Sequence, residues 1–221
     1  MVINMKKKKM NAWGYTIVKP IVKCLFYLLY RPRVIGLENV PKKGPYVLAG
    51  NHTKWLDSVM LVSVTKRNQV HFLAKEELWH GKGWIVVKAM GFIPVNRKIH
   101  DKDALIKAYE YLNNGNCIGI FPEGTINRTD DIIMPFKFGA VKMCKETGAD
   151  LIPFVITGKY KLFKRGITIE FLKPRKVTED LELENEKLMD SVSEKLEEYF
   201  LETGEKVVKK RGKNNGKKSK K

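Results

Sequence analysis

The sequence predicts an α/β domain in which helices cover a mixed, largely parallel β-sheet. Short apolar segments typical of strands alternate with segments typical of helices, and this alternation indicates a parallel sheet. Of the 221 residues, 43% are hydrophobic, which is enough for a packed core and too many for a disordered chain. The length fits one such domain with terminal extensions. Functional side chains are then expected in loops at the carboxyl ends of the strands.

The chain divides into three expected parts. Residues 1–33 hold a basic N-terminus and membrane-binding helices, residues 34–205 form the α/β domain, and residues 206–221 form a basic, disordered tail. Strands are predicted at residues 34–40, 46–49, 70–74, 92–95, 117–121, 151–157 and 167–172. Helices are predicted at residues 58–65, 82–90, 102–113, 137–146 and 183–201. In the last helix apolar residues recur at helical spacing, so one face is expected to pack on the sheet.

Residues 11–30, NAWGYTIVKPIVKCLFYLLY, predict an amphipathic helix, or two helices broken near Pro20. No small-residue cleavage site follows, which argues against a signal peptide. Lys19 and Lys23 interrupt the apolar pattern, and the clean run at residues 24–30 is far shorter than the ~20 residues of a membrane span. The apolar side and aromatic residues are typical of a helix lying in the membrane interface, with packing on the protein's own core as the alternative. Residues expected on the apolar side are Ile17, Val18, Ile21, Leu25, Leu28 and Leu29.

The formal net charge of +18 indicates an anionic partner, with nucleic acid, membrane phospholipid and a phosphorylated substrate as the alternatives. Four consecutive lysines at residues 6–9, and nine basic residues without an acid at residues 206–221, carry 13 of these charges. The domain itself is therefore only mildly basic. The tail is expected to be a solubilising segment or a tether to a membrane or RNA. No interleaving of aromatic and basic residues typical of an RNA-recognition sheet is present, so we expect no nucleic-acid partner.

The three cysteines are widely spaced, at Cys24, Cys117 and Cys144. They form no CxxC pair and no cluster with the spacing of zinc ligands. We therefore expect free thiols in a reducing compartment and no metal site.

The segment GNHTKWLD, residues 50–57, lies where a strand is expected to lead into a helix. With His52 in the loop and Asp57 in the first helical turn, the carboxylate can hold one ring nitrogen and leave the other free as a base. This is two-thirds of a Ser-His-Asp triad, yet the sequence has no GxSxG motif. If His52 is a base, the attacking hydroxyl therefore belongs to the substrate, which disfavours a hydrolase. The structural alternative is a surface loop whose polar residues cap the helix.

Three further segments follow or end predicted strands. GFIPVNR ends in Arg97, whose guanidinium suits a phosphate. FPEGTINR reads as a tight turn, with Glu123 able to hold a base or a cation and with Arg128 as a second positive group. LIPFVITG is apolar throughout, and its Pro153 indicates a strand end, a bulge or a place where an apolar substrate passes. For each segment taken singly there is a structural alternative. Arg97 is then an ordinary solvent-exposed arginine, and FPEGTINR is an ordinary turn between a strand and a helix.

In this order the four segments strongly resemble the motifs of the glycerolipid acyltransferase family, most closely those of bacterial 1-acyl-sn-glycerol-3-phosphate acyltransferases. The resemblance runs from about residue 34 to residue 172, with membrane-binding N-terminal helices in addition. AKEEL, at residues 74–78, also resembles a family segment whose lysine, here Lys75, lies by the substrate phosphate.

The resemblance implies that His52 deprotonates the free hydroxyl of lysophosphatidic acid, which then attacks the thioester of acyl-CoA or of acyl-carrier protein. Asp57 orients His52, so that neither an acyl-enzyme nor a metal or other cofactor is needed. It further implies that Arg97 binds the phosphate with help from Lys75 and Arg128. The residues implied to shape the pocket are Glu123, Gly124 and Thr125.

One residue departs from the family pattern. An arginine usually follows the Gly-Thr of the third motif, but this chain has Ile126 and places an arginine at Arg128. Either Arg128 replaces the family arginine in phosphate binding, or Arg97 and Lys75 hold the phosphate. The acceptor is therefore expected to be 1-acyl-glycerol-3-phosphate, with glycerol 3-phosphate or another lysophospholipid as the alternative. The resemblance and the basic arms imply a peripheral or monotopic protein on the anionic surface of the cell membrane, at its cytoplasmic face.

Overall fold

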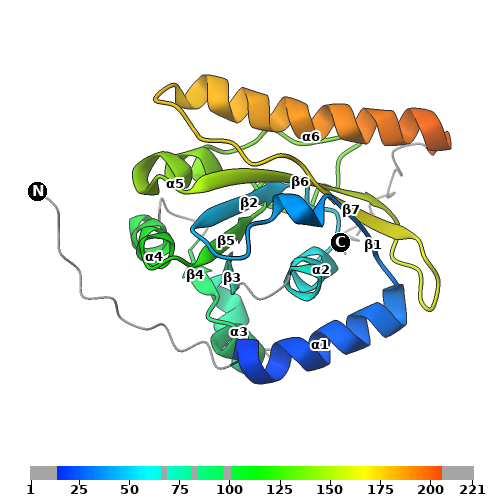
Figure 1. Ribbon diagram of the computed structural model, residues 1–221, viewed down its shortest axis with the longest axis horizontal. Coiled ribbons are helices and arrows are strands. Elements are labelled where there is room, and N and C mark those ends of the chain that lie inside the picture. Colours follow the sequence, from blue (N-terminus) through cyan, green and yellow to red (C-terminus); the bar gives the residue numbers. More distant parts are fainter. Residues whose placement is uncertain (1–13, 66–68, 81–83, 97–100, 206–221) are drawn as a thin grey trace, which may run out of the picture.

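The computed structural model describes residues 14–65, 69–80, 84–96 and 101–205. Within them, seven strands form one sheet in the order β1-β7-β6-β2-β5-β3-β4 (Figure 1). The strands are β1 (Arg33–Ile35), β2 (Tyr46–Gly50), β3 (Val70–Lys75), β4 (Ile93–Val95), β5 (Cys117–Ile120), β6 (Asp150–Gly158) and β7 (Ile167–Phe171).

The strand directions confirm a mixed, largely parallel sheet. β4, β3, β5, β2 and β6 pair in parallel, whereas β6 and β7 form an antiparallel hairpin and β1 runs parallel to β7. The carboxyl ends of the parallel strands therefore share one edge of the sheet with the start of β7 and β1. That edge receives the loops that carry the predicted motifs.

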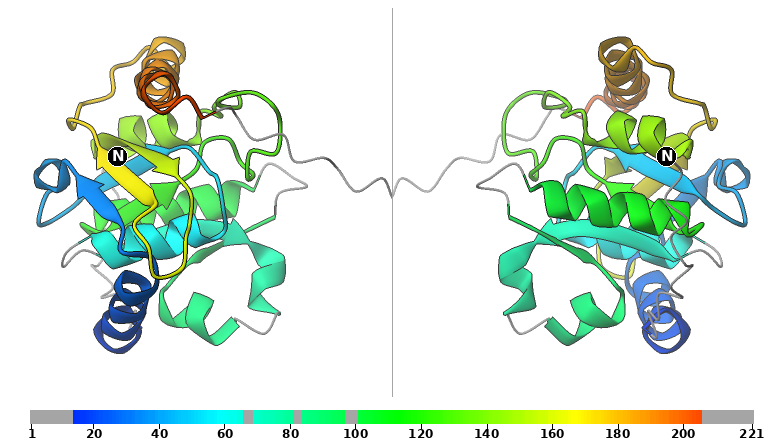
Figure 2. Two further views of the ribbon diagram at one scale, coloured as in Figure 1. Left: turned by 90° about the vertical axis from the view of Figure 1, so that its right-hand side faces the viewer. Right: turned by 90° about the vertical axis from the view of Figure 1, so that its left-hand side faces the viewer.

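Helices cover both faces of the sheet, as the views along and across it show (Figures 1 and 2). α1 and α2 lie on one face, and α4, α5 and α6 lie on the other. The helices are α1 (Gly14–Tyr30), α2 (Leu56–Val64), α3 (Trp84–Ala89), α4 (Lys102–Asn113), α5 (Gly139–Thr147) and α6 (Leu181–Thr203), with short 3₁₀ turns η1 (Leu37–Asn39) and η2 (Glu76–Trp79).

Most predicted elements lie within a few residues of the observed ones, but the first predicted strand does not continue to residue 40. It ends at Ile35, and η1 follows. Gly36 has a φ of 67°, and an added Cβ would meet the carbonyl oxygen of Phe171. The chain therefore turns away from β7 at the one residue whose missing side chain permits this conformation.

β2 illustrates why the strands read as continuous apolar runs. Tyr46 and Leu48 point into the core beneath α1 and α2, whereas Val47 and Ala49 point into the core beneath α4, α5 and α6. All four are fully buried. A strand covered on both faces has no polar side, so period-two alternation is lost.

β6 is buried in the same way, and Pro153 lies inside it, paired with Ala49 of β2. The prediction that Pro153 marks a strand end is therefore wrong.

α1 is one continuous helix that passes through Pro20, so the first alternative, a single helix, is confirmed and a break at Pro20 is excluded. Tyr15 and Phe26 are buried in the core beside α2. A stripe on the opposite side is more than half exposed, although every member is large and apolar: Ile17, Ile21, Leu25 and Leu28. The helix thus packs on the protein's own core and also presents an apolar stripe outward. Over the described ranges, no helix combines the length and apolarity needed to cross a membrane.

The arms at residues 1–13 and 206–221, which carry most of the net charge, lie outside the described residues.

A fully buried histidine, His71 of β3, lies between α1 and α4. Its Nδ1 lies 2.9 Å from the carbonyl oxygen of Gly91, and Nε2 has no hydrogen-bond partner among the described residues. The rings of Tyr15 and Tyr111 pack edge-on against the imidazole. Burial lowers the pKa of His71 to about 4. The folded chain therefore holds a neutral imidazole that donates its Nδ1 proton to Gly91.

We predict that acid destabilises the fold through His71. The folded-state pKa lies below the unfolded value of about 6.5, so the unfolded chain binds a proton first as the pH falls. The contribution of His71 to the free energy of unfolding should drop by about 2 kcal/mol between about pH 7 and pH 5, and level off below about pH 4. Urea unfolding of the wild type and of His71→Gln measures this. The variant should show the weaker pH dependence, whereas the exposed control His80→Gln should match the wild type.

Candidate active site

The chain leaves β2 through Asn51, which is almost completely buried. Its side-chain Oδ1 accepts a hydrogen bond from the backbone N–H of Ile156 at 2.8 Å, and its Nδ2 donates to the carbonyl oxygen of the same residue at 2.9 Å. The Asn51 amide thus mimics one more backbone pair between β2 and β6. The next residue, His52, therefore starts from a fixed position at the carboxyl edge of the sheet.

The predicted pair of His52 and Asp57 is formed. Nδ1 of His52 lies 2.9 Å from Oδ2 of Asp57, and the Asp57 side chain is fully buried whereas that of His52 is 14% exposed. Asp57 lies in the first turn of α2. The carboxylate also accepts the backbone N–H groups of Thr53 at 2.6 Å and Lys54 at 2.7 Å. One side chain therefore both organises the loop before the helix and holds the imidazole.

The ring of His52 stacks on Phe121, with centroids 4.0 Å apart and planes 12° from parallel. With Nδ1 held by Asp57, the other nitrogen, Nε2, has no hydrogen-bond partner among the described residues. Fixing Nδ1 as the donor leaves Nε2 with a lone pair. The geometry therefore suits a base that receives a proton at Nε2.

Tyr160, which the sequence analysis missed, completes the surroundings of Asp57. Its hydroxyl donates a hydrogen bond to Oδ1 of Asp57 at 2.6 Å, from the hairpin that joins β6 to β7. Burial, and then the charge of Asp57, raise the pKa of Tyr160, which keeps the phenol protonated as a donor. Its ring packs edge-on against Tyr30 and Phe26 of α1. No sequence spacing pairs residues so far apart.

Glu123 of the third motif contacts His52, as in the first of the two alternatives that the sequence left open, but it does so through the backbone. It is buried, and its Oε1 accepts the backbone N–H of His52 at 2.7 Å while its Oε2 accepts that of Met134 at 3.1 Å. The backbone N–H of Asn127 in turn donates to the carbonyl oxygen of His52 at 3.0 Å. Burial raises the pKa of the Glu123 carboxyl, against these hydrogen bonds. Glu123 thus holds the backbone at His52 and at Met134 rather than a cation.

Lys137, a cation that the sequence analysis did not predict at this site, lies against Gly124 of the third motif. Gly124 has a φ of 75°, and an added Cβ would lie 2.9 Å from Nζ of Lys137, so the lysine side chain lies across the glycine. The backbone N–H of Lys137 donates to the carbonyl oxygen of Pro122 at 3.0 Å. Thr125 is exposed beside them. The sequence signal was the lysine just before α5, which was assigned only to the predicted helix start.

The predicted phosphate ligands are placed less completely. Lys75 is the last residue of β3, paired with Val95 of β4, and Arg128 directly follows Asn127. Both side chains are exposed, and neither has a hydrogen-bond or ion-pair partner in the described part of the chain. Arg97 lies outside the described residues. The structure therefore brings Lys75 and Arg128 to the loops at the carboxyl edge of the sheet. Of the predicted site residues in the third motif, only Glu123 contacts His52 within the described residues, and the motif also contacts His52 through Phe121 and Asn127.

Comparison with known proteins identifies the family of the chain. The Acyltransferase family model matches residues 31–157, which is more than half of the chain. Over 139 residues the chain is 32% identical to the 1-acyl-sn-glycerol-3-phosphate acyltransferase of Bacillus subtilis, covering 61% of this chain and 68% of that protein. Over 137 residues it is 36% identical to the enzyme of the same name from Borreliella burgdorferi, covering 61% of this chain and 54% of that protein.

A solved structure shares the fold. The crystal structure of the 1-acyl-sn-glycerophosphate acyltransferase PlsC from Thermotoga maritima superposes with a TM-score of 0.68 at 20% identity, covering 87% of this chain and 83% of that chain. The α/β sheet and the matched region together define a transferase of acyl groups. The chain belongs to the acyltransferase family, as the four sequence motifs predicted.

We predict that Tyr160→Phe lowers the kcat of acyl transfer about tenfold with little change in KM, because a buried carboxylate loses one of its donors. The remaining carboxylate charge is less dispersed, so the acidic limb of the pH–rate profile should move to higher pH. Steady-state kinetics across pH measure both effects. Tyr30→Phe, which changes a neighbouring ring that does not contact Asp57 through a hydrogen bond, is the matched control. An equal loss of kcat in both variants, with an unshifted pH–rate profile, would mean that Tyr160 contributes through packing alone.

Proposed function

We propose that the chain transfers a fatty acyl group from acyl-CoA or acyl-carrier protein to the free hydroxyl of 1-acyl-sn-glycerol-3-phosphate, giving phosphatidic acid for phospholipid biosynthesis. The observation that carries the proposal is the imidazole of His52, which Asp57 holds through Nδ1 and which keeps Nε2 without a partner among the described residues. The names of the relatives from Bacillus subtilis and Borreliella burgdorferi support the acceptor. No cofactor beyond the acyl donor is proposed.

In the proposed reaction His52 is a general base. Nε2 takes the proton of the acceptor hydroxyl while the oxygen forms a bond to the thioester carbonyl carbon. The carbon–sulfur bond then breaks, and the leaving thiolate takes the proton back from the imidazolium. Asp57 stabilises the transient imidazolium and keeps the ring in the tautomer with its proton on Nδ1. The nucleophile belongs to the substrate, so no acyl-enzyme forms.

The acceptor phosphate is proposed to bind to Arg97, with Lys75 and Arg128 as further cations. Lys137 supports this assignment as an additional charge, because its amine lies over Gly124 in the motif where Ile126 replaces the usual arginine. A lysine at that point offers a compact charge instead of a bidentate guanidinium. Gly124 and Thr125 are proposed to shape the pocket around the acceptor.

The chain is further proposed to act as a peripheral protein on the cytoplasmic face of an anionic membrane. The support is the apolar stripe of α1, whose four large side chains are more than half exposed. A stripe of this kind on a short helix is typical of insertion into the headgroup boundary. The basic arms at both ends of the sequence would add attraction to anionic lipid.

We predict that His52→Ala lowers acyl transfer to lysophosphatidic acid about a thousandfold or more, because general base catalysis is lost. The chain should still fold, because Asp57 keeps the donors from Thr53, Lys54 and Tyr160, but the thermal unfolding midpoint should fall moderately because one donor and the stacking on Phe121 are lost. Release of free thiol from acyl-CoA in the presence of the acceptor measures the rate. His80→Gln, which alters an exposed histidine, is expected to keep full activity. Full activity in His52→Ala would refute the proposed base.

The acceptor itself is tested by a panel of lysophosphatidic acid, glycerol 3-phosphate and lysophosphatidylcholine with one acyl donor. We predict the highest kcat/KM with lysophosphatidic acid. A higher value with glycerol 3-phosphate or with another lysophospholipid would replace the proposed acceptor while leaving the chemistry intact.

A further inference from the structure

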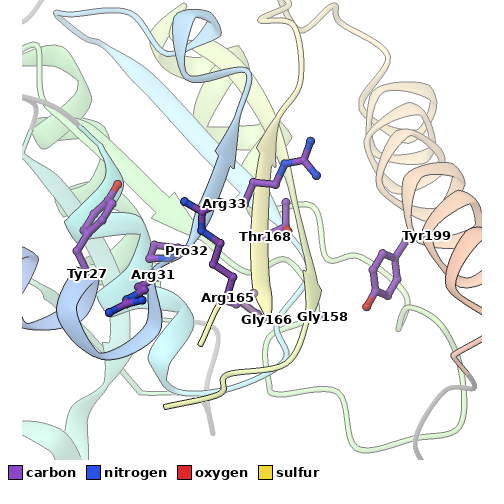
Figure 3. Close-up of a pocket in the computed structure, with 10 residues that line it drawn as sticks. Tyr27, Arg31, Pro32, Arg33, Gly158, Arg165, Gly166, Thr168 and Tyr199 are labelled. Carbon is purple, nitrogen blue, oxygen red and sulfur yellow. The ribbon is translucent and has the colours of Figure 1, made fainter. Parts of the chain in front are cut away.

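A cavity of about 730 Å³ opens at the β1–β7 margin of the sheet. In the strand order, β6 separates this margin from β2, β5 and β3. Three arginines from three separate segments line the cavity (Figure 3). Arg31 follows the last residue of α1, Arg33 begins β1, and Arg165 lies in the hairpin between β6 and β7. None of the three forms an ion pair with another described residue, although acidic side chains are common on the neighbouring α6. Three unpaired guanidinium groups around one cavity indicate an anionic ligand.

The backbone at Arg31 supports a role for its side chain. Its φ is 43°, and its N–H donates to the carbonyl oxygen of Tyr27 at 3.1 Å, so Arg31 ends α1 in the left-handed conformation. Glycine or asparagine usually occupies such a position, because a larger residue there is strained. An arginine held in a strained conformation at the rim of a cavity points to a function that requires its side chain.

Hydroxyl groups surround the arginines. The cavity is also lined by Tyr27 of α1, Thr168 of β7 and Tyr199 of α6 (Figure 3). Guanidinium N–H groups together with hydroxyl donors are the groups that bind phosphate oxygens. The cavity is much larger than one phosphate, so it has room for a phosphate that carries further groups.

Exposed apolar side chains beside the cavity indicate where that phosphate comes from. Leu162 and Phe163, at the tip of the hairpin that carries Arg165, are 58% and 60% exposed. The backbone N–H of Phe163 donates to the carbonyl oxygen of Leu29, which joins the hairpin tip to the end of α1 and its apolar stripe. Lys161 and Lys164 flank the tip and are exposed. Apolar side chains flanked by cations are typical of a surface that enters an anionic membrane.

We propose that this arginine cavity binds the phosphate of an anionic membrane phospholipid, at a site separate from the active site. Arg31, Arg33 and Arg165 hold the phosphate at headgroup level, while the stripe of α1 and the hairpin tip contact the acyl chains. The site rests on the membrane association proposed above and not on the identity of the acceptor. An acidic carrier protein fits less well, because the charges surround a cavity whose neighbours are exposed leucine and phenylalanine.

The test compares two triple variants of the full chain. The first replaces Arg31, Arg33 and Arg165 by glutamine, and the matched control replaces Lys102, Lys107 and Lys142, which are exposed on α4 and α5 across the sheet. Co-sedimentation is measured with vesicles of phosphatidylcholine alone and with added phosphatidic acid. We expect the arginine variant to lose at least about tenfold in affinity for the vesicles that contain phosphatidic acid, and the control to lose about twofold or less. The single variants Arg33→Gln and Arg165→Gln should each lose about threefold, and they serve if the triple variant does not fold.

Other outcomes overturn the proposal. Equal losses of vesicle affinity in both triple variants would show that net charge, and not the cavity, determines the binding. Thermal stabilisation of the wild type, but not of the arginine variant, by inorganic phosphate, with vesicle binding unchanged, would assign the cavity to a soluble phosphate. Loss of binding to acyl-carrier protein with vesicle binding unchanged would assign it to a protein partner. A wild type that binds no vesicle would refute the membrane association as well.

Acyl transfer measured in detergent separates a failure of the lipid site from a failure of the proposed function. The arginine variant should retain wild-type activity on lysophosphatidic acid there, because none of its changes lies in the active site. A wild type without that activity, but with the expected vesicle binding, would refute the function and leave the lipid site standing.

Discussion

The carboxylate of Asp57 is buried from water and accepts hydrogen bonds from groups in two parts of the chain, the loop after β2 and the β6–β7 hairpin. The loop after β2 contributes the N–H groups of Thr53 and Lys54, the imidazole of His52 contributes Nδ1, and the β6–β7 hairpin contributes the hydroxyl of Tyr160. A buried charge without such donors would be very costly. The positions of the loop, the start of α2, the base and the hairpin are therefore mutually dependent. Because the hairpin also packs on α1, the helix with the exposed apolar stripe is connected to the same carboxylate.

What the sequence predicts well is what depends on neighbours along the chain. The strands and helices follow from local apolar patterns, and the pairing of His52 with Asp57 follows from the start of one helix. The first strand was predicted too long because the conformation of Gly36 depends on Phe171, far away in sequence. Tyr160 and the contact of Lys137 with Gly124 were missed for the same reason. The acyltransferase family was predicted correctly because the order of four motifs carries information that no single motif has.

α1 shows why a helical wheel alone left two readings open. Its aromatic residues Tyr15 and Phe26 fill the core beside α2, while the four aliphatic residues of the stripe face outward. Both sides of the helix are thus largely apolar, and hydrophobicity does not separate them. What separates them is shape, since the bulky rings interdigitate with the sheet face and the stripe has nothing described to pack against. Packing on the core is therefore confirmed for one side of the helix, and the exposed stripe on the other side supports the proposed contact with a membrane.

Glu123 has a consequence for how this enzyme can diversify. Its two oxygens hold the backbone at His52 and at Met134, and Asn127 holds the other side of His52. The intervening loop is thus attached to the base at a few main-chain contacts, which do not depend on the side chains between them. Residues such as Ile126 and Arg128 can change without displacing the imidazole. The loop behaves as an exchangeable part, so its residues can change through evolution while the pair of His52 and Asp57 stays in place.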